Sequence, residues 1–407
     1  MRTAILCAVF LYLGNPATAK PLELTAKQRA HLLGKPADLK VSSDQVTLIG
    51  PWSLHQLVIS GVDANNNLSD LSFVSDYQSA NPKIATIDAT GLILPKGNGT
   101  TTITVRAGAL SKTIAVKVTG MDKPRPLSFR HDLIAVLNVG GCNSGACHGT
   151  PSGKNGFRLT LRGYDPPEDY IQLTRDVLGR RTDRHNPEAS LIYQKALARV
   201  PHEGGQRFRP DSIPAQIMKA WLTQGLRDDA KDLPTVEKIQ ILPGSRVLNA
   251  PSRYQQLAVH ATLSNGEVRD VTLLTVFSSI DRSVAEVSTE GFVQFSQAGE
   301  VAILCRYLDK METVRLTYLE PKPGFVWNNP TEKNYVDKHV FAKLKMLNIL
   351  PSDLCSDQEF LRRAYMDLCG ILPTSKEVVA FLNDKDSKER SKLIEKLLLR
   401  SEYADFW

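Results

Sequence analysis

The sequence lacks three features that would each assign it to a broad class of proteins. Beyond its N-terminal residues, no stretch approaches the roughly 20 apolar residues that a transmembrane helix needs. The net charge is only +7 over 407 residues, and no basic stripe is interleaved with aromatic residues, so nucleic-acid binding is not expected. Cysteine is scarce, with six in all, and one close pair has no second pair to complete a four-ligand zinc site. The modest positive charge suits an acidic surface or an anionic partner.

The one long apolar run belongs to the first 19 residues. Arg2 provides a positive start, Ala4 to Leu13 are apolar, and Ala17-Thr18-Ala19 forms a small-x-small cleavage site. This layout predicts a secretory signal peptide over residues 1–19 and an exported protein, periplasmic or at the cell surface. Removal of the signal peptide would also remove Cys7. An odd number of cysteines would then remain in an oxidising compartment, so at least one thiol is expected to be free or otherwise engaged. The five that remain are Cys142, Cys147, Cys305, Cys355 and Cys369.

Two stretches 200 residues apart align without a gap, from Ser79 to Val105 and from Ser279 to Cys305. In both, alternating apolar residues lead to a glycine turn and then to a second alternating run, which predicts a strand, a turn and a strand. A repeat at this distance indicates two copies of one β-domain rather than a solenoid. The matched positions are Ala85 with Ala285, Gly91 with Gly291, Gly99 with Gly299 and Ile103 with Ile303.

These stretches resemble the bacterial Ig-like group 2 family, through a strand of the type SANPKIATI or SIDRSVAEV followed by a glycine turn and a second strand. The resemblance implies two all-β Ig-like sandwiches, at residues 40–120 and 236–319. Such domains are usually spacers or adhesion modules on exported proteins, and their fold alone does not give their function. Cys305 stands where the first copy has Val105, so we expect it to be a small buried residue.

Between the repeats, two helices are predicted, one over residues 127–141 and one over residues 211–225. The first leads directly into Cys142-Asn143-Ser144-Gly145-Ala146-Cys147-His148. A helix, a cysteine loop and a closing helix form the plan of a small c-type cytochrome. In such proteins two thiols attach to the haem as thioethers, and the histidine after the second cysteine binds the iron. The usual spacing is Cys-x2-Cys-His, whereas here it is Cys-x4-Cys-His.

Residues 126–226 also resemble the planctomycete-type cytochrome-C-like domain, through CNSGACHGTPSGKNGFRLTLRGYDPPEDY, PEASLIYQKAL and VPHEGGQRF in this order. The resemblance implies a small all-α domain with covalent haem c. It assigns Cys142 and Cys147 as thioether sites and His148 as the proximal iron ligand.

The second axial ligand of such a haem is often a methionine, but none lies between Met121 and Met218. We therefore predict His202 as the distal ligand. His185, Met218 and an open sixth position remain as alternatives. Three arginines are candidates for pairing with the haem propionates, namely Arg180, Arg181 and Arg207.

Other interpretations of the cysteine loop stay open. A disulfide between Cys142 and Cys147 would close a short loop but would leave His148 without a role. A zinc site would want further ligands at paired spacings. A catalytic cysteine next to a histidine is disfavoured, because adjacent side chains rarely point the same way.

The remaining residues, 334–407, follow a proline-rich linker and predict helices with capping boxes at Ser356 and Thr374. FLRRAYMDLCGILPT and the ending LLLRSEYADFW resemble the start of the domain of unknown function that accompanies planctomycete-type cytochromes. In that family the domain continues, so a truncated sequence is expected to explain the end at Trp407. A disulfide between Cys355 and Cys369 is an open possibility.

Together these observations predict a multidomain fold with two all-β sandwiches, one small all-α domain and a C-terminal α-helical segment. The expected function is one-electron transfer by an exported c-type haem protein that exchanges electrons with a redox partner protein and turns over no substrate itself. The first alternative is a surface adhesion or scaffold protein that contacts a cell-surface polymer or protein through its Ig-like domains. The second is an accessory part of an enzyme whose site lies in a continuation beyond Trp407.

Overall fold

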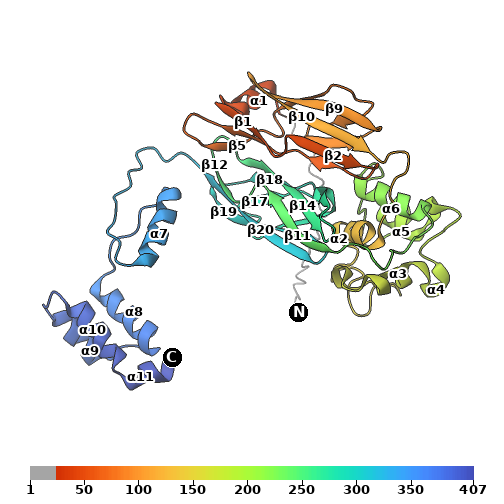
Figure 1. Ribbon diagram of the computed structural model, residues 1–407. Coiled ribbons are helices and arrows are strands. Elements are labelled where there is room, and N and C mark those ends of the chain that lie inside the picture. Colours follow the sequence, from red (N-terminus) through yellow and green to blue (C-terminus); the bar gives the residue numbers. More distant parts are fainter. Residues whose placement is uncertain (1–23) are drawn as a thin grey trace, which may run out of the picture. The chain divides into compact units, whose positions relative to one another are not determined.

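The computed structural model describes residues 24–407, which belong to two compact units, the first ending at Pro321 and the second beginning at Lys322 (Figure 1). The predicted signal peptide, residues 1–19, lies outside the described residues. Among the residues described, no helix combines the length and the apolar character that crossing a membrane requires. The chain is multidomain, with β-sheets through much of the first unit and helices alone in the second, as the sequence predicted at this coarse level.

The first unit begins with helix α1 (Ala26–Leu33). Thr25 caps this helix, because its hydroxyl accepts from the backbone N–H of Gln28 while the Gln28 side chain accepts from the backbone N–H of Thr25. This reciprocal arrangement satisfies two backbone donors that the first helical turn leaves free.

The first β-domain, residues 38–119, consists of strands from three sheets around one apolar core. One sheet contains β1 (Asp38–Val41), β4 (Ile59–Val62) and β5 (Leu68–Asp70). The second contains β2 (Gln45–Ile49), β10 (Leu110–Thr119), β9 (Gly99–Ala107) and β6 (Asp76–Ser79). The third contains β3 (His55–Gln56), β8 (Leu92–Pro95) and β7 (Ala85–Ile87). Alternate residues of β9 and β10 are buried, as expected for strands with one face toward a core.

The second β-domain, residues 236–319, repeats this plan strand by strand. One sheet contains β11 (Val236–Leu242), β14 (Ala258–Leu263) and β15 (Val268–Asp270). The second contains β12 (Arg246–Asn249), β20 (Lys310–Leu319), β19 (Gly299–Tyr307) and β16 (Val276–Ser279). The third contains β13 (Tyr254–Gln256), β18 (Phe292–Phe295) and β17 (Ala285–Val287). From β15 to β20 each strand has bounds 200 higher than its counterpart. Cys305 and Val105 are both fully buried, which confirms the expectation that Cys305 packs in the core.

The two β-domains share a sheet edge. Strand β5 of the first pairs in parallel with β12 of the second through Leu68 and Leu248, so that one sheet of seven strands runs across both domains. Phe73 also packs edge-on against Tyr254 and Phe292 of the second domain. The two copies are therefore joined by packing as well as by the chain.

Helices fill the segment between the β-domains. A π-helical turn (Phe129–Leu133) leads into α2 (Ile134–Val139), and α3 (Pro166–Thr174), α4 (Asp176–Gly179), α5 (Leu191–Ala196) and α6 (Ile213–Thr223) follow. Helices therefore lie in both places where the sequence predicted them. Their shared core is built around Trp221, whose ring lies against Phe129 and Tyr170. The indole nitrogen donates to the carbonyl of Arg227 at 2.9 Å, so the buried polar group of this side chain is satisfied.

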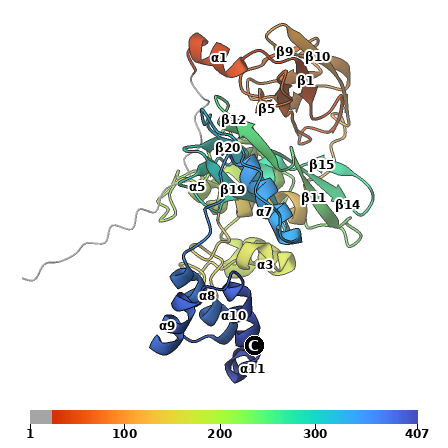
Figure 2. The same cartoon turned by 90° about the vertical axis from the view of Figure 1, so that its left-hand side faces the viewer.

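The second unit, residues 322–407, is helical. It contains α7 (Tyr335–Met346), α8 (Asp357–Cys369), α9 (Ser375–Asn383), α10 (Glu389–Leu398) and α11 (Ser401–Phe406), and Figure 2 shows α8 to α11 grouped together. The capping boxes predicted at Ser356 and Thr374 are present. Cys355 and Cys369 are free thiols, and Cys369 lies within hydrogen-bonding distance of the Leu397 carbonyl, so the structure contains no disulfide between them.

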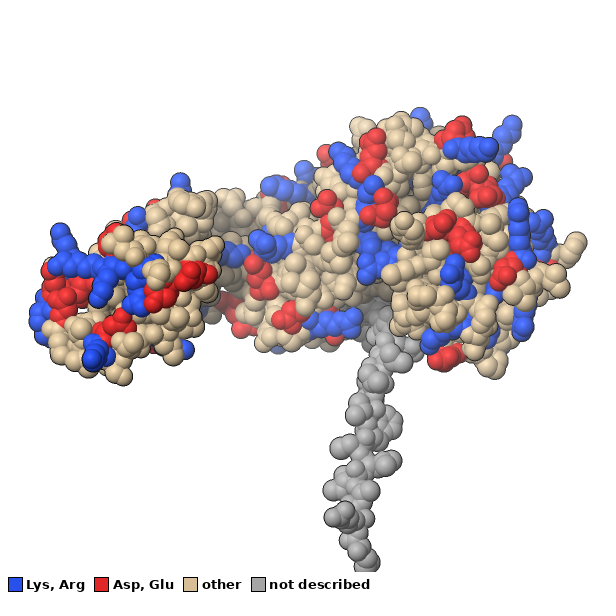
Figure 3. All heavy atoms as spheres, turned by 90° about the horizontal axis from the view of Figure 1, so that it is seen from below, with Lys and Arg blue, Asp and Glu red and all other residues tan. Residues whose placement is uncertain are grey.

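Charged side chains of both signs are interspersed over the surface that Figure 3 displays. Several form surface ion pairs, such as Arg29 with Asp76 at 2.8 Å and Lys154 with Glu203 at 3.0 Å.

Candidate ligand pocket

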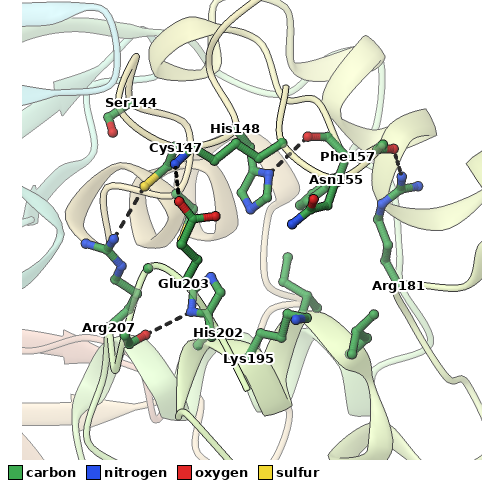
Figure 4. Close-up of a pocket in the computed structure, with 18 of the residues that line it drawn as sticks. Ser144, Cys147, His148, Asn155, Phe157, Arg181, Lys195, His202, Glu203 and Arg207 are labelled. Carbon is green, nitrogen blue, oxygen red and sulfur yellow. Dashed lines mark hydrogen bonds and ion pairs between the residues drawn. The ribbon is translucent and has the colours of Figure 1, made fainter. Parts of the chain in front are cut away.

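A pocket of about 610 Å³ opens where the loop after α2 meets α5 and the loop over residues 202–207 (Figure 4). This volume is within the range of small-molecule and cofactor sites. Its lining combines sulfur and imidazole groups with cations and apolar surface. The sulfur and imidazole residues are Cys142, Cys147, His148 and His202; the cations are Lys154, Arg180, Arg181, Lys195 and Arg207; the apolar residues include Phe157, Val177, Leu191 and Ile192. The four site residues predicted from the sequence therefore lie in one pocket.

The cysteine loop is held by its own backbone. The N–H of Cys142 donates to the carbonyl of Leu137 at 2.9 Å, and the N–H of His148 donates back to the carbonyl of Cys142 at 2.9 Å. Gly149 closes the loop so tightly that a Cβ atom there would lie 2.2 Å from the carbonyl oxygen of Asn143. The loop geometry thus requires glycine at this position, whereas Gly145 at its tip has open space around it.

Both cysteines of the loop are free thiols, so the disulfide interpretation is not what the structure contains. Cys142 packs against the helical core, and burial raises its pKa to about 11, only partly opposed by the positive charge of Arg207. The guanidinium of Arg207 donates to the sulfur of Cys147 at 3.4 Å. A thiol with a raised pKa stays protonated near pH 7 and is a poor nucleophile, which further disfavours a catalytic role for Cys142.

His148 is oriented by its neighbour. Its Nδ1 lies 3.0 Å from the carbonyl oxygen of Phe157, and a carbonyl only accepts, so Nδ1 carries the proton and Nε2 keeps its lone pair. The two rings lie 4.5 Å apart. Burial lowers the pKa of His148, opposed by the bond to Phe157 and assisted by the nearby His202. The imidazole is therefore neutral near pH 7, the form that binds a metal.

His202 reaches the pocket from a different loop (Figure 4) and is held in the same manner. Its Nδ1 lies 2.8 Å from the carbonyl oxygen of Gly205 and donates to it, which leaves Nε2 free. Gly204 packs against this ring, because a Cβ there would be 3.1 Å from Nε2. The alternatives lie elsewhere: His185 is exposed and is not among the lining residues, and Met218 is fully buried in the helical core.

The three arginines suggested for propionates differ in their surroundings. Arg181 is buried and donates to the carbonyls of Gln172 and Gly156, and its guanidinium stacks over Phe157 at 4.5 Å. It therefore supports the pocket wall that orients His148. Arg180 and Arg207 line the pocket.

No pattern in the sequence pointed to Phe157 as a site residue. It lies nine residues after His148, and its contact with that ring depends on how the chain turns back between them, which spacing alone does not show.

The donor set fits the cofactor that the sequence predicted. Two thiols for thioether bonds are present, and His148 and His202 each keep Nε2 free while a backbone carbonyl fixes Nδ1, as in metal-bound histidines whose other nitrogen is held by an acceptor. If haem c is bound, Cys142 and Cys147 would carry it, and the two imidazoles would be available to its iron, which supplies redox chemistry. The chain's own contribution is to orient both rings and to hold one thiol in an apolar setting. Covalent haem c at this pocket stays a prediction.

The cofactor prediction is tested by expressing the full chain with cytochrome c maturation proteins. We expect a pyridine haemochrome spectrum of the c type and a haem-stained polypeptide, both lost when Cys142→Ser and Cys147→Ser are combined and both retained in Cys355→Ser. We expect His202→Ala to change the spectrum of the bound haem without releasing it. A colourless wild-type protein would show that the prediction is wrong.

Two family models match the chain. The model described as the immunoglobulin-like domain of intimin matches residues 75–109, and a model described as a protein of unknown function (DUF1549) matches residues 335–407. A search of curated proteins found no match. Thus an Ig-like domain and a domain of unknown function, both expected from the sequence, are confirmed, while neither matching model describes a cytochrome.

Solved structures with some similarity include domains 5–6 of the S-layer protein SbsC, with 12% identity, a TM-score of 0.28, and coverage of 71% of this chain and 99% of that one. The adhesin InvE of Yersinia pseudotuberculosis is 10% identical with a TM-score of 0.15, and the match covers 69% of this chain and 58% of that one. At such TM-scores these likenesses carry no structural argument.

The comparisons correct the main functional prediction. Electron transfer by an exported haem protein with a redox partner was expected, but the two matching family models describe an Ig-like domain and a domain of unknown function. The main prediction is wrong on these findings, and the surface adhesion or scaffold alternative is the better supported. The reason is that a short cysteine and histidine motif occupies a small part of the chain, whereas two β-domains make up most of its first unit. A motif of this size does not fix the function of the whole protein.

Proposed function

We propose that this protein is an exported surface scaffold in which two Ig-like β-domains form a rigid pair and contact a cell-surface polymer or protein. The match to the intimin Ig-like domain in the first β-domain supports this proposal. The gapless repeat extends the same architecture to the second β-domain. A scaffold of this kind needs domains that hold a fixed geometry. The main support for the proposal is the contact between the first and the second β-domain.

That contact is a reciprocal pair of buried carboxylates. On one side, Asp70 of the first β-domain accepts from the side chain of Gln255 at 2.5 Å and from the backbone N–H of Gln256 at 2.8 Å. Its other oxygen accepts from the N–H of Ser72 at 2.7 Å. Asp70 is 1% exposed, so these bonds are made away from water, where leaving a donor unpaired is costly.

On the other side, Asp270 of the second β-domain accepts from the backbone N–H of Gln56 at 2.6 Å, and from the N–H and hydroxyl of Thr272 at 2.9 and 2.6 Å. Asp270 is the residue 200 positions after Asp70, and Gln256 is 200 positions after Gln56. Each domain thus inserts the same carboxylate against the same backbone position of the other. This two-way contact resembles a symmetric dimer interface built within one chain and fixes the orientation of the two domains.

The proposal is tested by the location of the protein on intact cells. An antibody raised against the full chain should label intact cells of the source organism as strongly as permeabilised cells, and protease added outside should remove the label. A cytoplasmic protein probed in parallel should be labelled only after permeabilisation. Labelling of this chain that also requires permeabilisation would contradict a surface scaffold.

The reciprocal contact has a pH dependence that a variant can isolate. Burial raises the pKa of Asp70 to about 6, against the hydrogen bonds from Gln256 and Ser72 and the charge of Arg246, which lower it. Because the folded state then holds its proton more tightly than the unfolded state, the stabilisation is full below the unfolded pKa of about 4 and is lost as pH rises through about 6. The expected change is on the order of 3 kcal/mol for this single group.

Urea unfolding followed by tryptophan fluorescence between pH 4 and 7 measures this change. We expect the stability of wild type relative to Asp70→Asn to fall over this interval and to stay constant above it, because the amide does not titrate. Other carboxyl groups, such as Asp169, are present in both proteins and cancel in the difference. A constant difference from pH 4 to 7 would contradict the raised pKa.

A further inference from the structure

The two sides of the reciprocal contact differ in chemistry. Around Asp70 the facing residues are Gln255 and Ser60, and Arg246 donates to the Ser60 hydroxyl at 2.9 Å. Around Asp270, the positions that correspond to Gln255 and Ser60 by the 200-residue repeat are His55 and His260. The repeat therefore places two histidines and a carboxylate where its other copy has an amide, a hydroxyl and a carboxylate.

These three side chains converge. The Oδ2 atom of Asp270 lies 3.9 Å from Nδ1 of His55 and 3.7 Å from Nε2 of His260. The two imidazole rings have their centroids 5.3 Å apart. One donor atom from each of the three residues falls within 4.8 Å of the others, and among the described residues this is the one group of three or more histidine, cysteine or acidic residues that does so.

The cluster is enclosed but not satisfied. The side chains of His55, His260 and Asp270 are 12%, 16% and 4% exposed. The Nε2 atoms of both histidines are buried without a hydrogen-bond partner. Buried polar atoms are nearly always paired. The unpartnered Nε2 of His260, which lies 3.7 Å from Oδ2 of Asp270, therefore calls for an explanation, as does the unpartnered Nε2 of His55, whose other ring nitrogen faces the same carboxylate.

The charge states suit a cation. Burial lowers the pKa of His55, with Asp270 opposing and His260 assisting the shift, so His55 is neutral near pH 7. Burial acts to raise the pKa of Asp270, but the neighbouring imidazoles and the Thr272 hydroxyl outweigh it, and the carboxyl stays ionised. Neutral imidazole and carboxylate are the forms in which these groups bind metal.

We propose that His55, His260 and Asp270 bind a divalent transition-metal ion, Zn²⁺ by the nature of the donors, which joins the first β-domain to the second. Two imidazoles and one carboxylate form a known type of three-ligand zinc set, with water in the fourth position. Bonds of about 2.1 Å in a tetrahedron separate neighbouring ligand atoms by roughly 3.4 Å. The observed 3.7 and 3.9 Å need only a small closing movement. His55 belongs to the first domain and the other two ligands to the second, so the ion would cross-link them.

The repeat supplies matched variants. His55→Gln and His260→Ser each place on this side the residue that the other side already carries, so we expect both proteins to fold with the domain contact intact. His339→Gln, which changes an exposed histidine of the second unit, is the control. Zn²⁺ is titrated by calorimetry into the full chain after EDTA treatment and dialysis. We expect wild type and His339→Gln to bind one more equivalent of Zn²⁺ than His55→Gln or His260→Ser. This additional Zn²⁺ should raise the melting temperature of wild type and His339→Gln.

Cobalt distinguishes this site from the cysteine pocket, because thiolate ligands give a near-ultraviolet charge-transfer band that nitrogen and oxygen ligands do not. We expect Co²⁺ to give wild type a visible band that is lost in His55→Gln, while any thiolate charge-transfer band is unchanged in this variant. His260→Ser gives a second, independent test where His55→Gln fails to fold. Equal metal binding by wild type and His55→Gln, or a cobalt spectrum with thiolate character alone, would overturn the proposal.

Discussion

Replacing Gly149 with alanine should open the cysteine loop. The new Cβ would lie 2.2 Å from the carbonyl oxygen of Asn143 and 2.9 Å from that of Ser144, and both are backbone atoms that cannot rotate away. The strain should break the bond from the Gly149 N–H to Ser144 and the neighbouring bond from His148 to Cys142. We expect a loss of about 3 kcal/mol in the free energy of unfolding, at the upper end of overpacking effects.

The measurement is thiol labelling located by peptide mapping. A pKa of about 11 leaves Cys142 almost entirely protonated at pH 8, and its return to an ordinary thiol pKa should speed labelling by about 100-fold through the thiolate fraction. Gly145→Ala is the control, since nothing lies within 4 Å of the Cβ that it adds. Slow labelling of Cys142 in Gly149→Ala, at the rate of Gly145→Ala, would contradict the tight closure of the loop.

Replacing Asp70 with alanine should weaken the contact between the β-domains. The change leaves the side chain of Gln255 and the backbone N–H groups of Gln256 and Ser72 without their acceptor. Unpaired buried donors cost about 1–3 kcal/mol each, so we expect a total loss of about 4 kcal/mol, with some relief from water entering the gap. Hydrogen exchange should rise in β13 and β5, the strands that meet at Asp70.

Asp76→Ala provides the comparison for this variant. Asp76 lies in the same domain, but its side chain is 77% exposed and pairs with Arg29 at the surface, where ion pairs contribute little. We expect its unfolding and exchange to match wild type. If Asp70→Ala gave the same unfolding curve and the same protection of β13 as Asp76→Ala, the reciprocal contact would not be what holds the domains together.

Local patterns in the sequence predicted the elements well. The alternation and glycine turns of the repeat correspond to β7, β8 and β9 and to their counterparts β17, β18 and β19. The capping boxes at Ser356 and Thr374 formed as expected. These features follow from interactions between residues a few positions apart, which the sequence lists in order.

The pocket was predicted in part. Cys142, Cys147, His148 and His202 line one cavity, as their assignment to one site required. The supporting residues were not found, because Phe157 and Arg181 act on His148 through a carbonyl contact and a stacked guanidinium. Such contacts depend on how loops fold back on each other. The cysteine and histidine motif led to a prediction of electron transfer through haem. The match to an Ig-like domain supports a function in the β-domains instead.

By itself, the sequence determined that two copies of one β-domain flank a helical segment with a cysteine loop, because periodicity and turn residues are local properties. It did not reveal that Asp70 and Asp270 each accept a hydrogen bond from the other β-domain, or that the imidazole of His55 lies next to that of His260. Only the tertiary structure decided these contacts. They join residues about 200 positions apart, and their existence depends on the angle at which two closed domains pack, which is set by the sum of many side-chain contacts rather than by any single motif.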